Sequence, residues 1–88
     1  MKYTVSWSPS AERDLTEMWL NHPDLRLQIT AAADSIDSLL RTAPQERGES
    51  RFGTVRILIV SPLVVDFQVT ADDLRVEVLS VGLPRRKR

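Results

Sequence analysis

The first residues of the chain alternate between apolar and polar side chains. From Tyr3 to Trp7 every second side chain is apolar, which predicts a half-buried β-strand over residues 2–7. Ser8 and Pro9 follow, a pair typical of a helix N-cap and the first helical position. The sequence therefore predicts a strand that leads directly into a helix.

Apolar positions spaced by three and four residues then recur over 11–19 and again over 25–40, the period of two amphipathic helices. Residues 21–24 include a proline and interrupt the first helix, and residues 42–44 end the second. Because the connection is only about four residues long, we expect the two helices to form an antiparallel hairpin.

Three apolar stretches fill the second half of the chain, at 55–60, 63–69 and 74–81. Turn-forming residues separate them, so we expect an antiparallel meander of three strands. The polar segment 45–54 is expected to be a loop, with a short strand start as the alternative. The element order is strand, helix, helix, strand, strand, strand. We therefore expect an α+β domain over residues 1–84, in which the helix hairpin covers one face of a four-stranded sheet.

Alternation within the second and third strands assigns the two faces of this sheet. The best core candidates are Ile57, Ile59, Val65 and Phe67. The opposite face then carries Arg56, Leu58, Val60, Val64, Asp66 and Gln68. We expect the aromatic residues Trp7, Trp19 and Phe67 in the core. The apolar residues Leu58, Val60, Val64 and Leu79 predict a patch that binds a partner protein, with the groove between the helix hairpin and the sheet as the alternative.

The composition excludes several kinds of site. The 88 residues include no cysteine and one histidine, so disulfides, thiol catalysis, cysteine-ligated zinc and histidine-rich metal sites are excluded. We expect no metal and no cofactor. No apolar run approaches the roughly 20 residues of a membrane span. The amino terminus turns polar within ten residues, unlike a signal peptide, so we expect a cytoplasmic protein with no membrane partner.

Charge is unevenly spread along the chain. Twelve basic and twelve acidic residues cancel. Residues 85–88 hold four of the basic ones, so residues 1–84 carry eight basic against twelve acidic side chains. A general nucleic-acid binder shows a basic face and a high isoelectric point. This chain instead places a basic C-terminal tail on a mildly acidic body.

Several stretches together resemble a known family. Residues 3–15, YTVSWSPSAERDL, combine a strand with a helix start of the form x-P-x-A-x-x-D-L. Residues 32–44 are similar to that family's second helix and its terminating proline, and residues 55–58, 62–69 and 76–81 to its three closing strands. In order, spacing and length they resemble the RelE/ParE superfamily, the toxins of type II toxin–antitoxin pairs. The resemblance covers essentially the whole chain.

The resemblance implies a growth-inhibiting toxin of the kind used in plasmid stabilization. Such toxins are held inactive in a hetero-oligomer by a cognate antitoxin whose C-terminal segment wraps around them. RelE-like members cleave mRNA in the ribosomal A site, whereas ParE-like members poison DNA gyrase and are not nucleases. Three hypotheses stay open: a gyrase poison, an mRNA endonuclease with a divergent site, and a catalytically inert binding module of the same fold.

For a nuclease, the resemblance implies lysines and arginines on the exposed sheet face and a late tyrosine or histidine. Arg56 matches one basic position, and Arg85 or Arg86 the arginine after the last strand. Leu58 and Val64 occupy positions where cations are expected. The only tyrosine and histidine are Tyr3 and His22, both early in the chain. The set of nuclease residues is therefore incomplete. It lacks cations that would stabilise the phosphorane and an acid that would protonate the leaving oxygen.

Four further arginines are candidates for contacts to nucleic acid, and each has a simpler interpretation. They are Arg47, Arg51, Arg86 and Arg88. The simpler interpretation of Arg47 and Arg51 is that they are solvated charges in a polar loop. The simpler interpretation of the tail 85–88 is a disordered end that aids solubility. Arg56 is alternatively paired with a carboxylate on a neighbouring strand, either Asp66 or Glu77.

Overall fold

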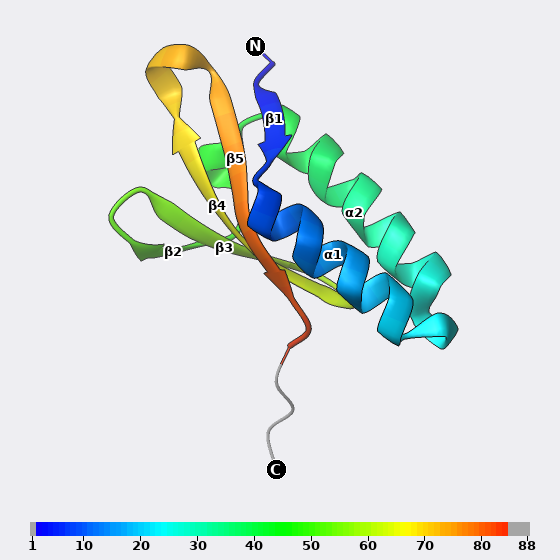
Figure 1. Cartoon of the computed structure of the whole chain (residues 1–88). Helices are drawn as coiled ribbons and strands as arrows, with labels where there is room; N and C mark the ends of the chain where they lie inside the picture. The colour runs from blue at the N-terminus through cyan, green and yellow to red at the C-terminus, as the bar shows by residue number, and fades with distance from the viewer. Residues whose placement is uncertain (1, 85–88) are drawn as a thin grey trace.

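Two antiparallel helices lie across one face of a five-stranded sheet, as Figure 1 shows. The structure is a computed structural model that describes residues 2–84, without the side chains of residues 51 and 52. The elements are β1 (Thr4–Trp7), α1 (Pro9–Asn21), α2 (Arg26–Arg41), β2 (Glu49–Phe52), β3 (Val55–Val60), β4 (Leu63–Thr70) and β5 (Arg75–Gly82). The strand order is β1-β5-β4-β3-β2. The predicted α+β fold, helix hairpin and closing meander are confirmed.

The sheet has one strand more than the sequence predicted. β2 pairs antiparallel with β3 at the sheet edge, inside the stretch expected to be a loop with a short strand start as the alternative. Its polar residues lack the apolar alternation by which strands are recognised. β1 also differs from its neighbours, because it runs parallel to β5 while every other pair is antiparallel.

Ser8 joins the start of α1 to β5. Its side-chain oxygen accepts a hydrogen bond from the Ala11 backbone N–H at 3.0 Å, as the predicted N-cap should. The same hydroxyl donates to the Leu79 carbonyl at 3.1 Å. The Ser8 backbone N–H donates to the Val78 carbonyl at 2.9 Å. The helix start is therefore fixed against the last strand as well as capped.

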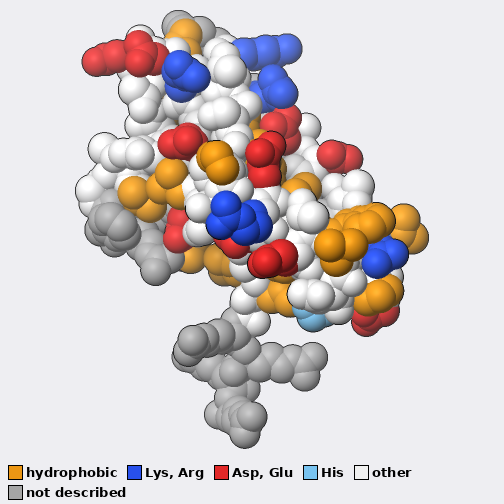
Figure 2. Space-filling model, in the orientation of Figure 1, with side chains coloured by type: hydrophobic (Ala, Val, Ile, Leu, Met, Phe, Trp, Pro, Cys, Tyr) orange, Lys and Arg blue, Asp and Glu red, His pale blue; other side chains and the backbone are white. Residues whose placement is uncertain are grey.

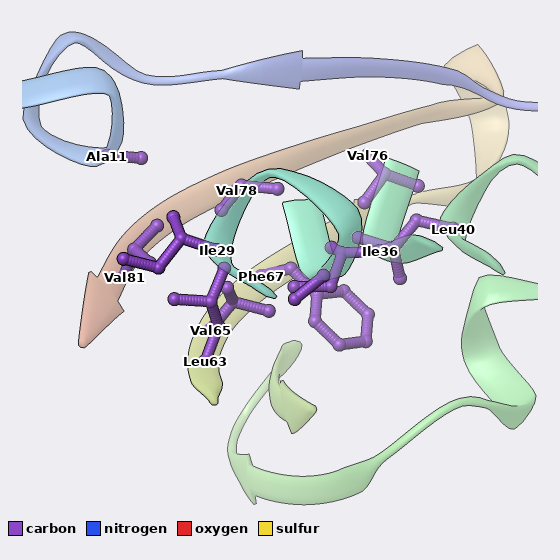
Figure 3. Packing of buried hydrophobic residues seen from close by; sticks show 11 residues of the cluster. Ala11, Ile29, Ile36, Leu40, Leu63, Val65, Phe67, Val76, Val78 and Val81 are labelled. Carbon is purple, nitrogen blue, oxygen red and sulfur yellow. The ribbon is translucent and has the colours of Figure 1, made fainter. Parts of the chain in front are cut away.

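The core lies between α2 and the strands β4 and β5 (Figure 3). Its buried members are Ala11, Ile29, Ala32, Ile36, Leu40, Leu63, Val65, Phe67, Val76, Val78 and Val81. Burying one such large apolar side chain stabilises the fold by about 1.5–3 kcal/mol. The predictions for Val65 and Phe67 are confirmed, and Trp7 packs partly buried against this cluster. The prediction for Trp19 is wrong, because this residue stays 40% exposed near the end of α1.

The predicted orientation of β3 is wrong by one residue. Leu58 pairs with Val65, and Val60 with Leu63, so both lie on the helix-covered face and pack against the core. Ile57 and Ile59 point to the opposite face, and Ile59 is 63% exposed. Leu58 and Val60 therefore do not belong to the predicted partner-binding patch. Nearly every residue of β3 is apolar, so its alternation carried no information about which face is buried.

Gly48 lies where α2 connects to β2 and provides a test of this packing. Its φ is +64°, and a Cβ there would overlap the Ile57 carbonyl group. Gly53 has a similar φ of +54° but open space around the same position. We predict that Gly53→Ala lowers the free energy of unfolding by about 1 kcal/mol, the backbone cost alone. We predict that Gly48→Ala costs at least about 2 kcal/mol more, because the overlap adds to it.

Urea denaturation of both variants measures this difference directly. Equal unfolding midpoints for Gly48→Ala and Gly53→Ala would contradict the close contact between the loop and β3.

Candidate functional site

The sheet face turned away from the helices, here called the open face, contains a shallow hollow of about 420 Å³. Its lining comes from three neighbouring strands and the residues after β5: Ile57, Ile59, Val64, Asp66, Ser80, Val81, Gly82, Leu83 and Pro84. The sheet register places these strands side by side, pairing Ile59 with Val64 and Ile57 with Asp66. The hollow therefore has a largely apolar floor.

A β-bulge shapes the polar part of the hollow. Asp66 pairs with Ser80, whereas the next residue of β4, Phe67, pairs with Val78, which leaves Leu79 as the extra residue. The Ser80 hydroxyl donates a hydrogen bond to Asp66 Oδ2 at 3.1 Å. The predicted patch residue Leu79 lies at this bulge and does not line the hollow, whereas Val64 does. The open face thus places a carboxylate beside exposed aliphatic side chains.

Arg56 lies on the other side of the sheet, away from this hollow. Its cross-strand neighbour is the buried Phe67, so it shares the helix-covered face. The Arg56 Nε–H donates to the Arg47 carbonyl at 2.9 Å, and an Nη–H donates to the Gly48 carbonyl at 3.0 Å. The predicted pairing with Asp66 or Glu77 is therefore replaced by bonds to backbone oxygens. Arg56 holds the connection between α2 and β2 in place.

Of the remaining candidate cations, the structure describes only the side chain of Arg47. Arg47 is half-buried, and its Nε has no hydrogen-bond partner among the described residues. Arg51 belongs to β2, but its side chain lies outside the description. The tail residues, with the candidates Arg85, Arg86 and Arg88, also lie outside the described residues. None of the described side chains that line the hollow is basic.

The two candidates for a general acid are also far from the hollow in the fold. Tyr3 precedes β1, and its hydroxyl accepts a hydrogen bond from Gln45 Nε2 at 2.7 Å. His22 caps the C-terminal end of α1. Neither residue lines the hollow. Among the described residues that line the hollow, there is no cation for a phosphate and no tyrosine or histidine for a leaving oxygen.

The arrangement of the open face therefore favours contact with protein over phosphate chemistry. Pentacovalent phosphate needs preorganised cations or N–H donors. Exposed aliphatic side chains instead match the apolar side chains of a protein surface.

Two kinds of group are absent from residues 2–84. No three histidine, aspartate or glutamate side chains there come close enough together to hold a metal ion. No helix within the same range is long and apolar enough to cross a membrane.

Comparison with known proteins identifies the fold. No family model matches the chain, and no curated protein matches its sequence. Among solved structures, it is similar to the RelBE2 toxin–antitoxin complex of Mycobacterium tuberculosis, with a TM-score of 0.77 and 17% identity, covering 96% of this chain and 93% of that one. For the chromosomal ParDE toxin–antitoxin system of P. aeruginosa the TM-score is 0.77 and the sequence identity 19%, and the match covers 96% of this chain and 98% of that one. For the isolated E. coli RelE toxin the TM-score is 0.64 and the identity 16%, and the match covers 97% of this chain and 87% of that one.

These neighbours are toxin components of toxin–antitoxin systems or complexes that contain them. The RelBE2 and ParDE structures have the same TM-score to this chain. The fold alone therefore does not separate a RelE-like from a ParE-like mode of action, and the side chains of the open face must do so.

The structural role of Arg56 gives a prediction for a single substitution. We predict that Arg56→Ala lowers the free energy of unfolding by about 2–3 kcal/mol, because two carbonyl oxygens lose a charged donor. Arg75→Ala removes an exposed arginine of β5 and should change it by less than about 0.5 kcal/mol. Thermal unfolding of both variants measures the difference. A stable Arg56→Ala protein that has lost its biological effect would show instead that Arg56 acts on a target.

Proposed function

The chain has the fold of the RelE and ParE toxins, and we propose that it is itself the toxin component of a type II toxin–antitoxin pair. Support comes from the near-complete coverage of toxin structures from three bacterial species. In this proposal a cognate antitoxin holds the toxin inactive in a hetero-oligomer. Its site of action is the bacterial cytoplasm.

We further propose that the toxin acts by binding a protein target, DNA gyrase, and does not cut RNA. The observation that carries this proposal is the lining of the open face, where Ile57, Ile59 and Val64 surround Asp66. Removing one preorganised donor from an enzyme's charge-stabilising site costs about 10²–10³ in rate. A hollow without a cation among the described residues that line it therefore makes a poor site for an attacking 2′-oxygen and its phosphate.

A second candidate function, ribosome-dependent mRNA cleavage, is favoured by one observation. Leu83 and Pro84 line the hollow, and the basic residues 85–88 follow them directly in the sequence. In this alternative Arg85 and Arg86 would bring the missing cations to the hollow, with Arg47, Arg51 and Arg88 contacting nucleic acid. It still lacks a general acid near the open face.

Pulse-labelling of a bacterial host after induction tests the proposal. We predict that thymidine incorporation falls within the first minutes while methionine incorporation continues, because gyrase poisoning blocks replication before translation. Early loss of methionine incorporation would move the target to the ribosome. Neither loss, with soluble protein present, would make the chain a binding module without toxicity.

Two matched variants connect this effect to the open face. Ile59→Asp places a charge on the hollow's apolar floor and should reduce growth inhibition at least tenfold, at unchanged protein level. Leu27→Asp makes the same change at an 85% exposed position of α2 and should leave inhibition intact. Equal toxicity of the two variants would argue against the open face as the target-binding surface.

A further inference from the structure

The outer edge of β5 changes its neighbour halfway along the strand. β1 pairs with β5 only as far as Trp7 and Val78, whereas β5 continues to Gly82. Beyond Val78 the place of a neighbouring strand is taken by α1, which Figure 1 shows beside the second half of β5 and Figure 2 shows in space-filling form from the same side. Backbone N–H and C=O groups along this stretch of edge therefore need partners from the helix.

One side of α1 supplies these partners. Ser8, Ala11 and Asp14 are spaced by three residues, so they lie on the same side of the helix. At one end the Ser8 hydroxyl donates to the Leu79 carbonyl, and at the other Asp14 Oδ2 accepts a hydrogen bond from the Val81 backbone N–H at 3.2 Å. Ala11 between them is fully buried, and its small side chain lets the helix approach the strand closely. The Asp14 carboxylate thus takes the place of a strand carbonyl.

The bond between Asp14 and Val81 lies at the edge of the hollow on the open face. Residues 80–84 line the hollow on the side of β5 and are here called the β5 wall. The β-bulge at Leu79 comes directly before this wall, and the pairing with β4 ends at Gly82. The ladder with β4 is therefore interrupted just before the wall and ends inside it. The contact with α1 is a second attachment that holds the wall in place.

Asp14 differs from the neighbouring acidic residues of α1. Glu12 and Glu17 are exposed, whereas Asp14 is half-buried and bonded to β5. An ionised carboxylate is the stronger kind of acceptor for a backbone N–H. Removing it leaves the N–H without a partner at a site that is largely screened from water. Glu17 offers a matched position on the same helix without this contact.

We propose that Asp14 is a positioning residue of the open face: its bond to the Val81 N–H holds the β5 wall in the arrangement that target binding requires. Asp14 is not among the residues that line the hollow, so its influence passes through the backbone of β5. This inference rests on the proposed function for the target alone. The placing of the wall by Asp14 does not depend on it.

The expected size of the effect follows from the kind of bond that is lost. Removing a hydrogen bond to a charged acceptor shifts a local equilibrium by about tenfold or more. The apparent affinity of a binding site falls with the fraction of molecules in which the site is correctly formed. Loss of the bond should therefore increase local opening of the β5 wall and weaken target binding while the domain stays folded.

Two substitutions at Asp14 separate the hydrogen bond from the charge. Asp14→Asn and Asp14→Ala both remove the negative charge, but only asparagine keeps a side-chain oxygen that accepts the Val81 N–H. Amide hydrogen exchange, followed by NMR on the full chain, reports on this bond. We predict that Asp14→Ala speeds exchange of the Val81 N–H at least about tenfold relative to that of the buried Val76, and that Asp14→Asn changes it by less than about threefold. Equal exchange in the two variants would overturn the proposal.

Growth inhibition shows whether the position of the wall matters for the target. We predict that Asp14→Ala lowers inhibition at least about fivefold at equal protein level, and that Asp14→Asn stays within about twofold of the unsubstituted chain. Two controls should leave inhibition unchanged. Glu17→Ala removes an exposed carboxylate from the same helix, and Ile36→Val removes a methylene from the core and so lowers stability far from the hollow. If Ile36→Val lost as much inhibition as Asp14→Ala, general destabilisation would explain both losses and overturn the proposal.

The two measurements separate this inference from the proposed function. If the unsubstituted chain does not inhibit growth but Asp14→Ala frees the Val81 N–H, the proposed function fails and Asp14 still positions the β5 wall. If Asp14→Ala inhibits growth as strongly as the unsubstituted chain although its Val81 N–H exchanges faster, target binding does not require the wall. The inference then fails and the proposed function stands.

Discussion

The parallel pairing of β1 with β5 is the constraint on which the rest of the structure depends. It joins the first strand to the last, with Val5 beside Val76 and Trp7 beside Val78. Two parallel strands cannot be joined by a tight turn, so the chain must cross over between them. Both helices belong to this crossover and cover a single face of the sheet (Figure 1). Ser8 fixes the crossover's start, because it caps α1 and bonds to β5.

Covering one face leaves the other open, and β4 determines its chemistry. Val65 and Phe67 point into the core, whereas Val64 and Asp66 point away from it. β3 adds Ile57 and Ile59 to the open side, and its arginine is directed to loop carbonyls on the other side. The open face therefore combines aliphatic surface with a carboxylate. This combination suits a protein target.

Elements with strong local signals could be predicted from the sequence. Ser8 followed by Pro9 located the start of α1, and Asp66 and Gln68 oriented β4 because polar residues alternate with apolar ones there. The uniformly apolar β3 offered no such marker, so its faces were exchanged and Leu58 was assigned to the wrong side.

Tertiary contacts account for the other differences. Arg56 is on the helix-covered face because its guanidinium reaches two backbone oxygens of a loop, a contact that strand alternation does not predict. Trp19 stays partly exposed because α1 ends two residues after it, and its ring lies against Arg26 instead of the core. Val64 lies on the open face as predicted. The hollow around it depends on a bulge at Leu79, which no local sequence pattern predicts.

The central claim is that the open face binds protein and does not cut RNA. The most direct test mixes the purified chain with ribosomes that carry a defined mRNA. Primer extension on the mRNA would locate any cleavage within the codon in the A site. The account predicts no cleavage above the level seen without the protein. Efficient cleavage in the A site would contradict it, and would require catalytic groups other than the described side chains that line the hollow.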